Sequence, residues 1–222
     1  MIRSHVRGAS IAVALATAAC SSATQGTARP SRQTAAPSPS DIAAIAKAQA
    51  DSARRPYTEA DIRFMSGMIS HHAQAIKMAG WAPTRGAGSS VKILCERIIN
   101  AQQDEIHSMQ TWLRDRRQPV PEASANGMKM MMNGVEHTML MPGMLTDAQM
   151  QQLDKARGTE FDRLFLTFMI QHHRGAIEMV KELFGSYGAG QDETVFKFAS
   201  DVNVDQTTEI ARMERMLAAL TP

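Results

Sequence analysis

The chain has 222 residues, with 24 Lys and Arg against 22 Asp and Glu. This length suits one medium-sized domain with appendages. Arg3 and Arg7 are the only Lys, Arg, Asp or Glu residues before Cys20, so the rest of the chain carries 22 basic and 22 acidic residues. Nucleic-acid-binding proteins present an excess of basic charge. The composition therefore argues against a nucleic-acid partner.

The first 20 residues have the pattern of a secretory signal. Arg3 and Arg7 precede an apolar run from Ile11 to Ala19 that is too short to span a bilayer and ends in small residues. The end of this run resembles a lipoprotein cleavage site at Cys20, although Thr17 stands where Leu is usual. We expect an exported protein of the periplasm or cell envelope, in contact with a membrane only through a lipid anchor at Cys20.

The rest of the chain divides into a tether and a folded domain. Residues 21–40 are dominated by Ser, Thr, Ala, Gln and Pro, a composition that buries too little apolar surface to fold. The expected organisation is a signal at 1–20, a flexible tether with a short helix at 21–56, and a domain at 57–222. Within the domain we expect a first hairpin at 57–117, a connector at 118–158 and a second hairpin at 159–222.

Capping residues and breakers place the helices. Thr58 with Asp61, and Thr146 with Gln149, are typical of helix N-termini. The predicted helices run from residue 58 to 82, 91 to 116, 146 to 157, 159 to 184 and 192 to 220. Strand-like alternation of convincing length is missing from both halves of the sequence. The pattern predicts an all-α fold: an antiparallel four-helix bundle of two pseudo-symmetric hairpins joined by a Met-rich connector.

One segment occurs twice. Residues 64–78 recur as residues 165–179 at a constant offset, which indicates one structural unit used twice. The repeated pairs are Phe64/Phe165, Met68/Met169, Ile69/Ile170, His71/His172, His72/His173, Ala75/Ala176, Ile76/Ile177 and Met78/Met179. The segment combines imidazole with thioether, and soft metals favour such ligands.

The second helix of each predicted hairpin repeats as well. Gln102, Glu105 and Met109 correspond to Gln206, Glu209 and Met213. Spacings of three and seven residues place these side chains on one helix face. A buried Gln or Glu without a partner costs about 1–3 kcal/mol. We therefore expect the His-His helix to supply partners for both.

These residues resemble the exported family known as domain of unknown function 305. The resemblance rests on the doubled Met-Ile-x-His-His-x-x-Ala-Ile helix, the Gln-x-x-Glu-Ile partner helix, the connector segment Met141–Thr146 and the lead-in Gly158–Phe165. It covers about Tyr57 to Leu220. It implies a ferritin-like helical bundle, with some members associated with copper or silver handling. The two copies differ, since Met65 becomes Leu166 and Gly67 becomes Phe168, so the resemblance does not imply two equivalent sites.

The repeated helices carry the candidate metal ligands. Adjacent helical residues point about 100° apart, while residues three, four or seven apart share a face. A soft Cu(I) or Ag(I) ion suits one imidazole with one or two thioethers. The candidate ligands are His71, His72, His172, His173, Met68, Met78, Met169 and Met179. Glu105, Glu209, Gln102 and Gln206 are expected to orient the imidazoles rather than to bind metal. The alternative is a core in which Met fills gaps and His binds a carboxylate.

The connector adds a second group of candidates. Seven methionines surround His137 in a stretch whose turn residues disfavour a helix: Met128, Met130, Met131, Met132, Met139, Met141 and Met144. In an extended chain Met128, Met130 and Met132 face one side, as do Met139 and Met141. His137, Met139 and Met141 are candidate ligands here. The alternative is a flap that covers the apolar end of the bundle. His107, without a counterpart in the second half, is expected on the surface.

Three functions compete. The leading hypothesis is an exported, non-enzymatic protein that buffers or sequesters Cu(I), and also Ag(I). A ferritin-like di-metal oxidase needs Glu-x-x-His pairs, which the chain lacks, and Asp61 and Asp162 lie ten residues before the first His of each pair, about 15 Å along a helix. The third is a structural or interaction module without metal. The sequence leaves open the oligomeric state and whether the His pairs form one site or two.

Overall fold

The computed structural model describes residues 38–40, 42–43, 46, 57–132 and 134–220. The predicted signal and most of the predicted tether lie outside these residues. The chain divides into two compact units, Met1–Ile42 and Ala43–Pro222, and every element named below belongs to the second. Among the described helices, none combines the length and apolar character needed to cross a membrane.

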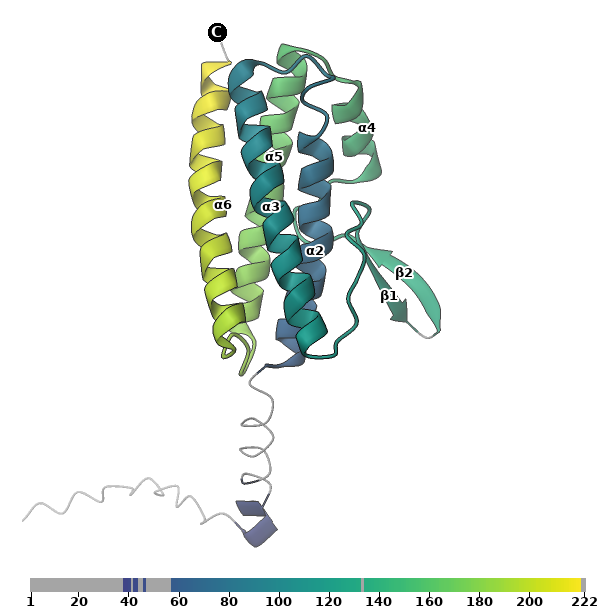
Figure 1. The fold of residues 1–222 in the computed structure, drawn as a ribbon, viewed down its shortest axis with the longest axis vertical. Coiled ribbons are helices and arrows are strands. Elements are labelled where there is room, and N and C mark those ends of the chain that lie inside the picture. The colour runs from purple at the N-terminus through teal and green to yellow at the C-terminus, as the bar shows by residue number, and fades with distance from the viewer. Residues whose placement is uncertain (1–37, 41, 44–45, 47–56, 133, 221–222) are drawn as a thin grey trace, which may run out of the picture. The chain divides into compact units, whose positions relative to one another are not determined.

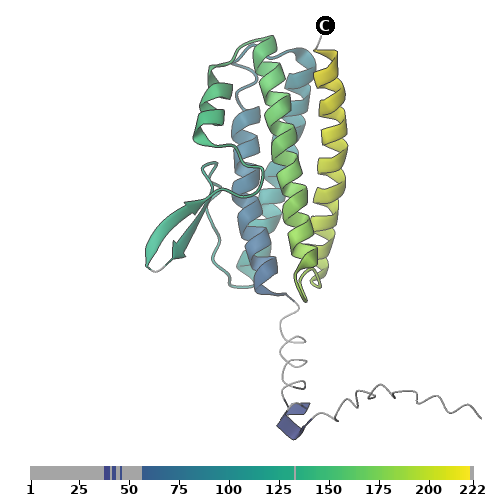
Figure 2. The same ribbon diagram turned by 180° about the vertical axis from the view of Figure 1, so that it is seen from behind.

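Four long helices lie side by side, accompanied by one short helix (Figures 1 and 2). The long helices are α2 (Glu59–Ala79), α3 (Ser89–Asp115), α5 (Thr159–Gly185) and α6 (Glu193–Ala219), and the short one is α4 (Asp147–Lys155). Each predicted helix is present with ends within a few residues of those expected. The helical fold class is confirmed, with α2–α3 and α5–α6 as the two hairpins.

Local capping explains where helices begin. Thr58 forms a capping box with Asp61 at the start of α2, and Thr146 forms one with Gln149 at the start of α4. Both arrangements satisfy backbone N–H groups that a helix end leaves without intrahelical partners. The capping predictions are therefore confirmed.

Two repeated aspartates connect the hairpins. Asp61 Oδ1 of α2 accepts a hydrogen bond of 2.7 Å from Gly190 N, just before α6. Its counterpart Asp162 of α5 accepts from Gly88 N, just before α3, at 3.0 and 3.1 Å. Each carboxylate thus binds the turn of the other hairpin, which fixes the two halves in register.

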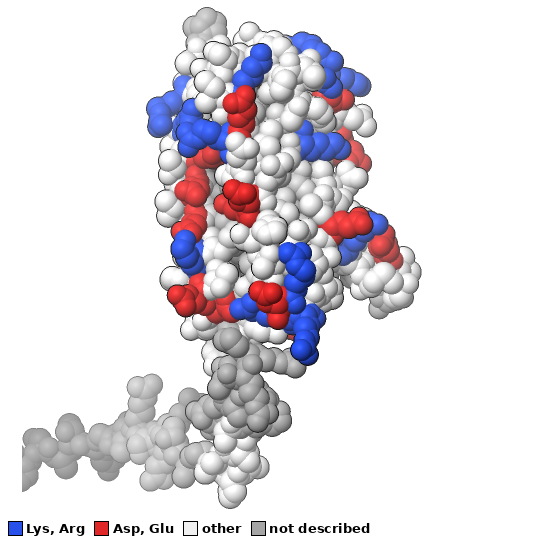
Figure 3. Space-filling model, viewed as in Figure 1, with Lys and Arg blue, Asp and Glu red and all other residues white. Residues whose placement is uncertain are grey.

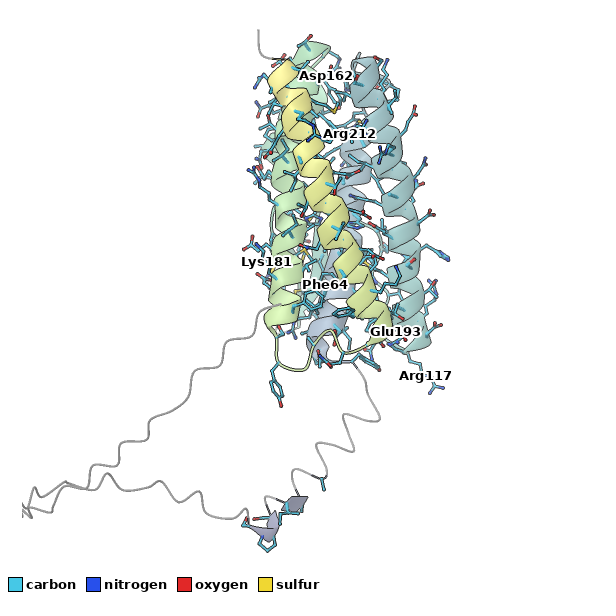
Figure 4. The ribbon with its side chains drawn as sticks, turned by 90° about the vertical axis from the view of Figure 1, so that its left-hand side faces the viewer. Phe64, Arg117, Asp162, Lys181, Glu193 and Arg212 are labelled. Carbon is cyan, nitrogen blue, oxygen red and sulfur yellow. The ribbon has the colours of Figure 1, made fainter. Side chains whose placement is uncertain are left out.

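The apolar core forms two clusters at different levels. Figure 4 places Phe64, near the start of α2, and Asp162, near the start of α5, toward opposite ends of the bundle, because α2 and α5 run antiparallel. Met68 of α2 consequently shares a cluster with Met179 of α5. Met78 of α2 and Met169 of α5 share the other. The paired histidines occur in both helices where one cluster gives way to the other.

The connector contains a small sheet that the sequence analysis did not predict. β1 (Met128–Met132) and β2 (Val135–Met139) form an antiparallel hairpin beside α2 (Figure 1). Gly134 in the turn has φ of 79°, a conformation that glycine adopts without steric cost. The expectation of no convincing strand was wrong because five-residue strands give only a weak periodic signal. In these strands Met128, Met130 and Met139 have the extended backbone that was considered as one arrangement of the connector.

Charges of both signs are mixed over the bundle face shown in Figure 3. Acidic and basic side chains lie close together along that face rather than in separate fields. This surface agrees with the near-neutral balance of the sequence.

Candidate metal centre

The centre of the bundle contains four buried imidazoles. His71, His72, His172 and His173 each expose 1% or less of their surface. The rings of His71 and His172, one from each hairpin, stack with centroids 3.8 Å apart and planes 38° apart. Within each helix the neighbouring rings are farther apart, at 6.2 and 6.4 Å. Among the four imidazoles, the inner pair His71 and His172 thus forms the contact between the two hairpins.

The outer pair, His72 and His173, faces the second helix of its own hairpin. His173 Nε2 lies 2.7 Å from Glu209 Oε2 in a hydrogen bond. His72 Nε2 lies 2.6 Å from Glu105 Oε2, although this contact is not aligned as a hydrogen bond. Both glutamates thus lie against the imidazoles, as the repeat in the partner helices predicted. Their role in orienting metal ligands stays a prediction.

The hydrogen bond of His71 fixes its tautomer. His71 Nε2 lies 3.0 Å from the carbonyl oxygen of Pro142. A carbonyl only accepts, so Nε2 carries the proton and Nδ1 is left with a free lone pair. That Nδ1 is buried and without a hydrogen-bond partner. The sequence analysis missed Pro142, because nothing local in the sequence shows that it contacts a helix 71 residues away.

Several other imidazole nitrogens also have no partner among the described residues. Nδ1 of His72 and of His173 is buried without a hydrogen bond, and so are both ring nitrogens of His172. Each unpaired buried polar group costs about 1–3 kcal/mol. Unpaired groups gathered at one level of a core favour a site built for a ligand.

Burial also keeps the inner imidazoles neutral. Desolvation lowers the pKa of His71 well below its usual value, and the nearby His72 and His173 lower it further. The pKa of His172 is lowered by desolvation first and then by His71, His173 and His72. Neutral imidazole is the form that binds metal. The inner pair is thus held in its ligand form at neutral pH.

The glutamines of the partner helices do not find the partners expected for them. Gln102 and Gln206 are 2% and 3% exposed, yet the amide oxygen of each is buried without a hydrogen bond. The expectation that the His-His helices satisfy these oxygens was wrong. The glutamates reach the imidazoles, and the oxygen atoms of the glutamines do not.

The connector covers the seam between α2 and α5. Gln74 Oε1 accepts from Leu145 N at 2.6 Å, and Gln74 Nε2 donates to Leu145 O at 3.0 Å. At the position in α5 that corresponds to Gln74 the chain has Gly175, where an added Cβ would lie 2.0 Å from the carbonyl oxygen of Pro142. The repeat therefore breaks where the connector passes. The difference between Gln74 and Gly175 is visible in the sequence, and it could have indicated where the connector contacts the two helices.

The candidate thioethers fall into two groups. Met68, Met78 and Met169 are fully buried in the core clusters. Met179 instead lines a cavity of about 210 Å³ between the bundle and the hairpin. Four connector methionines line the same cavity: Met128, Met130, Met139 and Met141.

The remaining candidates lie apart from these groups. His137 is exposed on β2, in register with Met130, and is not part of the cavity lining. His107 is exposed on α3, as expected. In the described part of the chain, no three His, Cys, Asp or Glu side chains converge on a point that would hold a metal ion. The imidazoles form pairs. A third ligand for a bound metal ion would therefore be a methionine sulfur, or a side chain that moves into the site.

Known structures with a similar fold include metal-bound ones. A protein from Streptomyces coelicolor, described as secreted and as DUF305, is 29% identical with a TM-score of 0.60, and the match covers 72% of this chain and 93% of that chain. A DUF305 fragment from Deinococcus radiodurans is 26% identical with a TM-score of 0.60, covering 74% and 99%. CopM in its Cu(I)-bound form is 26% identical with a TM-score of 0.55, covering 73% and 98%. CopM is also known in Ag-bound and Cu(II)-bound forms.

Sequence comparison points the same way. The uncharacterised protein L153 of Acanthamoeba polyphaga mimivirus is 39% identical over 57 residues, which are 26% of this chain and 38% of that protein. The chain thus matches well under half the length of this relative. The model of the family "Domain of unknown function (DUF305)" matches residues 61–217, a range that contains both His pairs and both partner helices. The chain therefore belongs to the DUF305 family.

Proposed function

We propose that the protein is an exported copper-binding protein that buffers or sequesters Cu(I), and by the same chemistry Ag(I), without catalysing a reaction. The observation that carries this proposal is the inner imidazole pair. His71 and His172 are fully buried and neutral, and they have three ring nitrogens without partners between them. A bound ion would use lone pairs whose burial is otherwise only a cost.

The surroundings of the pair suit a soft ion. Met68 and Met169 lie three residues before His71 and His172, on the same helix faces, and both are fully buried. Thioether and imidazole together favour Cu(I), and neither has to lose a proton to bind it. Glu105 and Glu209 hold His72 and His173 from the other side, as carboxylates commonly hold metal-binding imidazoles.

Two likenesses support the choice of metal and compartment. CopM, known in Cu(I)-, Cu(II)- and Ag-bound forms, shares the fold over 73% of this chain at 26% identity in its Cu(I) form. The Streptomyces coelicolor protein is described as secreted, which supports export through the signal at residues 1–20. The lipid anchor at Cys20 and a location in the periplasm or cell envelope remain parts of the proposal.

The carboxylates favour binding over di-metal oxidase chemistry. Asp61 and Asp162 are occupied by the backbone N–H groups of Gly190 and Gly88 at the bundle ends. Glu105 and Glu209 each contact one imidazole of their own hairpin. The carboxylates are thus assigned to capping and imidazole contacts, and the proposed ligands are nitrogen and sulfur.

The test is an anaerobic Cu(I) titration of the full chain against a chromogenic Cu(I) chelator. Cys20→Ser is included in every sample, so that the Cys20 thiol does not compete for the metal; the remaining thiol, Cys95, is buried. His71→Gln/His172→Gln removes the inner pair, and His107→Gln, on the exposed face of α3, is the matched control. We expect the double variant to lose the tightest equivalent, with affinity at least about 100-fold weaker, or about 2.7 kcal/mol.

The outcomes separate the hypotheses. The control should bind as the native chain does. Equal binding by the double variant would overturn the proposal for the inner pair. No competition with the chelator by the native chain would leave a structural or interaction module as the better account. Helix content measured by circular dichroism shows whether each variant is folded before its titration is interpreted.

A further inference from the structure

The β-hairpin has two chemically different faces. In the antiparallel register Met128 lies opposite Met139, and Met130 lies opposite His137, so these side chains share one face. The other face contains Met131 and the pair Lys129–Glu136, whose Nζ and Oε1 atoms are 3.0 Å apart. Met131 is 68% exposed. The face with Met128, Met130 and Met139 is the one that lines the cavity against the bundle.

Five thioethers from three separate segments line this cavity. Met128, Met130 and Met139 come from the hairpin, Met141 follows it, and Met179 comes from α5. Phe64, Pro142 and Leu183 complete most of the apolar wall, while Arg63, Glu182 and Ser186 supply its polar groups. We name this cavity, with its five methionines, the thioether pocket.

The bundle provides a floor for the pocket. A Cβ added at Gly67 would lie 2.8 Å from Met141 Sδ and 3.4 Å from Met179 Cε. The ends of these two thioethers therefore pack against the backbone of Gly67, in space that a side chain at residue 67 would need. The equivalent residue in the second copy of the repeat is Phe168, whose ring would occupy that space. Gly67 therefore lets Met141 and Met179, two of the pocket methionines, approach the backbone of α2.

Simple packing does not account for this arrangement. The pocket is a half-open cavity of about 210 Å³, and four of its five methionines belong to the connector rather than to the bundle helices. Met139 is also 45% exposed, so the pocket has contact with solvent. Convergent thioethers around open, solvent-connected space are a suitable environment for a soft monovalent cation.

We propose that the thioether pocket is a second binding site for Cu(I) or Ag(I), formed by sulfur donors alone and separate from the imidazole pair. This proposal deepens the copper-binding function and rests on it for the choice of metal, but it uses none of the four histidines. Neutral thioethers release no proton on binding. Glu182 supplies a negative charge near the bound cation, which Arg63 on the same lining partly offsets.

The pocket and the imidazole pair are adjacent through the connector. Met141 lines the pocket, and the next residue, Pro142, accepts the hydrogen bond from His71. Gly67 at the floor lies four residues before His71, one helical turn along α2. The two sites are therefore neighbours in space with different donors and different access to solvent.

The test is a titration of the full chain with Ag(I), followed by NMR of methionines labelled with carbon-13 at the ε-methyl group. Ag(I) is diamagnetic and does not oxidise, so each of the chain's 17 methionines can be followed. Met128→Leu/Met130→Leu/Met139→Leu removes three sulfur donors with little change in apolar volume. Met131→Leu, on the opposite face of the same hairpin, is the matched control.

We expect two equivalents of Ag(I), enough for both the imidazole pair and the pocket, to shift the ε-methyl signals of the five pocket methionines in the native chain and in Met131→Leu. The triple variant should bind one fewer ion per chain. Unshifted pocket signals, or an undiminished ion count in the triple variant, would overturn the proposal.

A histidine variant makes this result independent of the proposed function. In His71→Gln/His172→Gln the pocket signals should still shift, because the sulfur donors remain. Loss of the shifts there would show that the pocket does not bind metal separately and would overturn the proposal. Shifts confined to the pocket in the native chain, with no change at Met68 and Met169 beside the imidazoles, would refute the imidazole site and leave the pocket proposal standing.

Discussion

The side of the α2–α5 pair that faces α3 and α6 preserves the internal repeat, and the side that faces the connector breaks it. On the first side His72 contacts Glu105 and His173 contacts Glu209, at nearly equal distances. On the second side Gln74 binds the connector backbone through its amide, and Gly175 lets the same connector approach without a side chain.

This difference gives the two copies of one helix unlike surroundings. A single connector can pass over a two-fold seam only asymmetrically, so residues beneath it must differ between the copies. Gly67 lets Met141 and Met179 approach α2, whereas the second copy has Phe168 at the equivalent position. The symmetric face supplies imidazoles, and the asymmetric face supplies the sulfur pocket.

Gly175→Ala should break the asymmetric side with the largest effect on stability. Its Cβ would lie 2.0 Å from Pro142 O, so the connector must move away from α5. We expect a loss at the upper end of the usual overpacking range, about 3 kcal/mol, measured by urea unfolding of the metal-free chain. Gly185→Ala, with nothing within 4 Å of its new Cβ, is the control and should be close to neutral. Equal stability of the two variants would contradict the close packing of the connector.

Glu105→Gln and Glu209→Gln should weaken metal binding on the symmetric side. Each change removes the carboxylate that contacts an outer imidazole, and such partners commonly contribute about 10–100-fold to metal affinity. Cu(I) competition with a chelator measures the effect. Glu214→Gln, which removes only an exposed pair with Arg174, should bind normally. Similar affinities for all three variants would show that the outer imidazoles play no part in binding.

The pH dependence of the metal-free chain should show the smallest effect. The pKa values of His71 and His172 are lowered by burial, so below pH 6.5 the unfolded chain takes up protons that the folded chain does not. Stability is therefore fully present above the unfolded pKa and falls as pH decreases. The two groups together should remove on the order of 1 kcal/mol between pH 7 and pH 6. Urea unfolding at both pH values measures this loss, and His71→Gln/His172→Gln should reduce it. An unchanged loss in that variant would assign the effect to other groups.

The helices were predictable because their signals are local. Thr58 with Asp61 and Thr146 with Gln149 are capping boxes within four residues, and the apolar stripes follow a fixed period. The contacts of Glu105 and Glu209 were also predictable, since both partner helices repeat in step with the His pairs. Local periodicity and internal repetition thus predicted the helices and the contacts of the outer imidazoles.

The rest depends on contacts between distant segments. The stacking of His71 on His172 requires the relative level of two antiparallel helices, which no local pattern specifies. The contact of Pro142 with His71 depends on the path of the connector. The hairpin was missed because its strands are short. The two copies of the repeat differ at residues 67 and 74, and these differences are the sequence signal for the position of the connector.

The central claim is that imidazoles of the bundle centre bind Cu(I), and copper K-edge X-ray absorption tests it most directly. The sample is Met128→Leu/Met130→Leu/Met139→Leu, in which the thioether pocket is disabled, with Cys20→Ser and one equivalent of Cu(I). The account predicts nitrogen donors with the outer-shell scattering of imidazole, lost when His71→Gln/His172→Gln is added. A spectrum with sulfur donors alone, or one unchanged by the histidine substitutions, would contradict it.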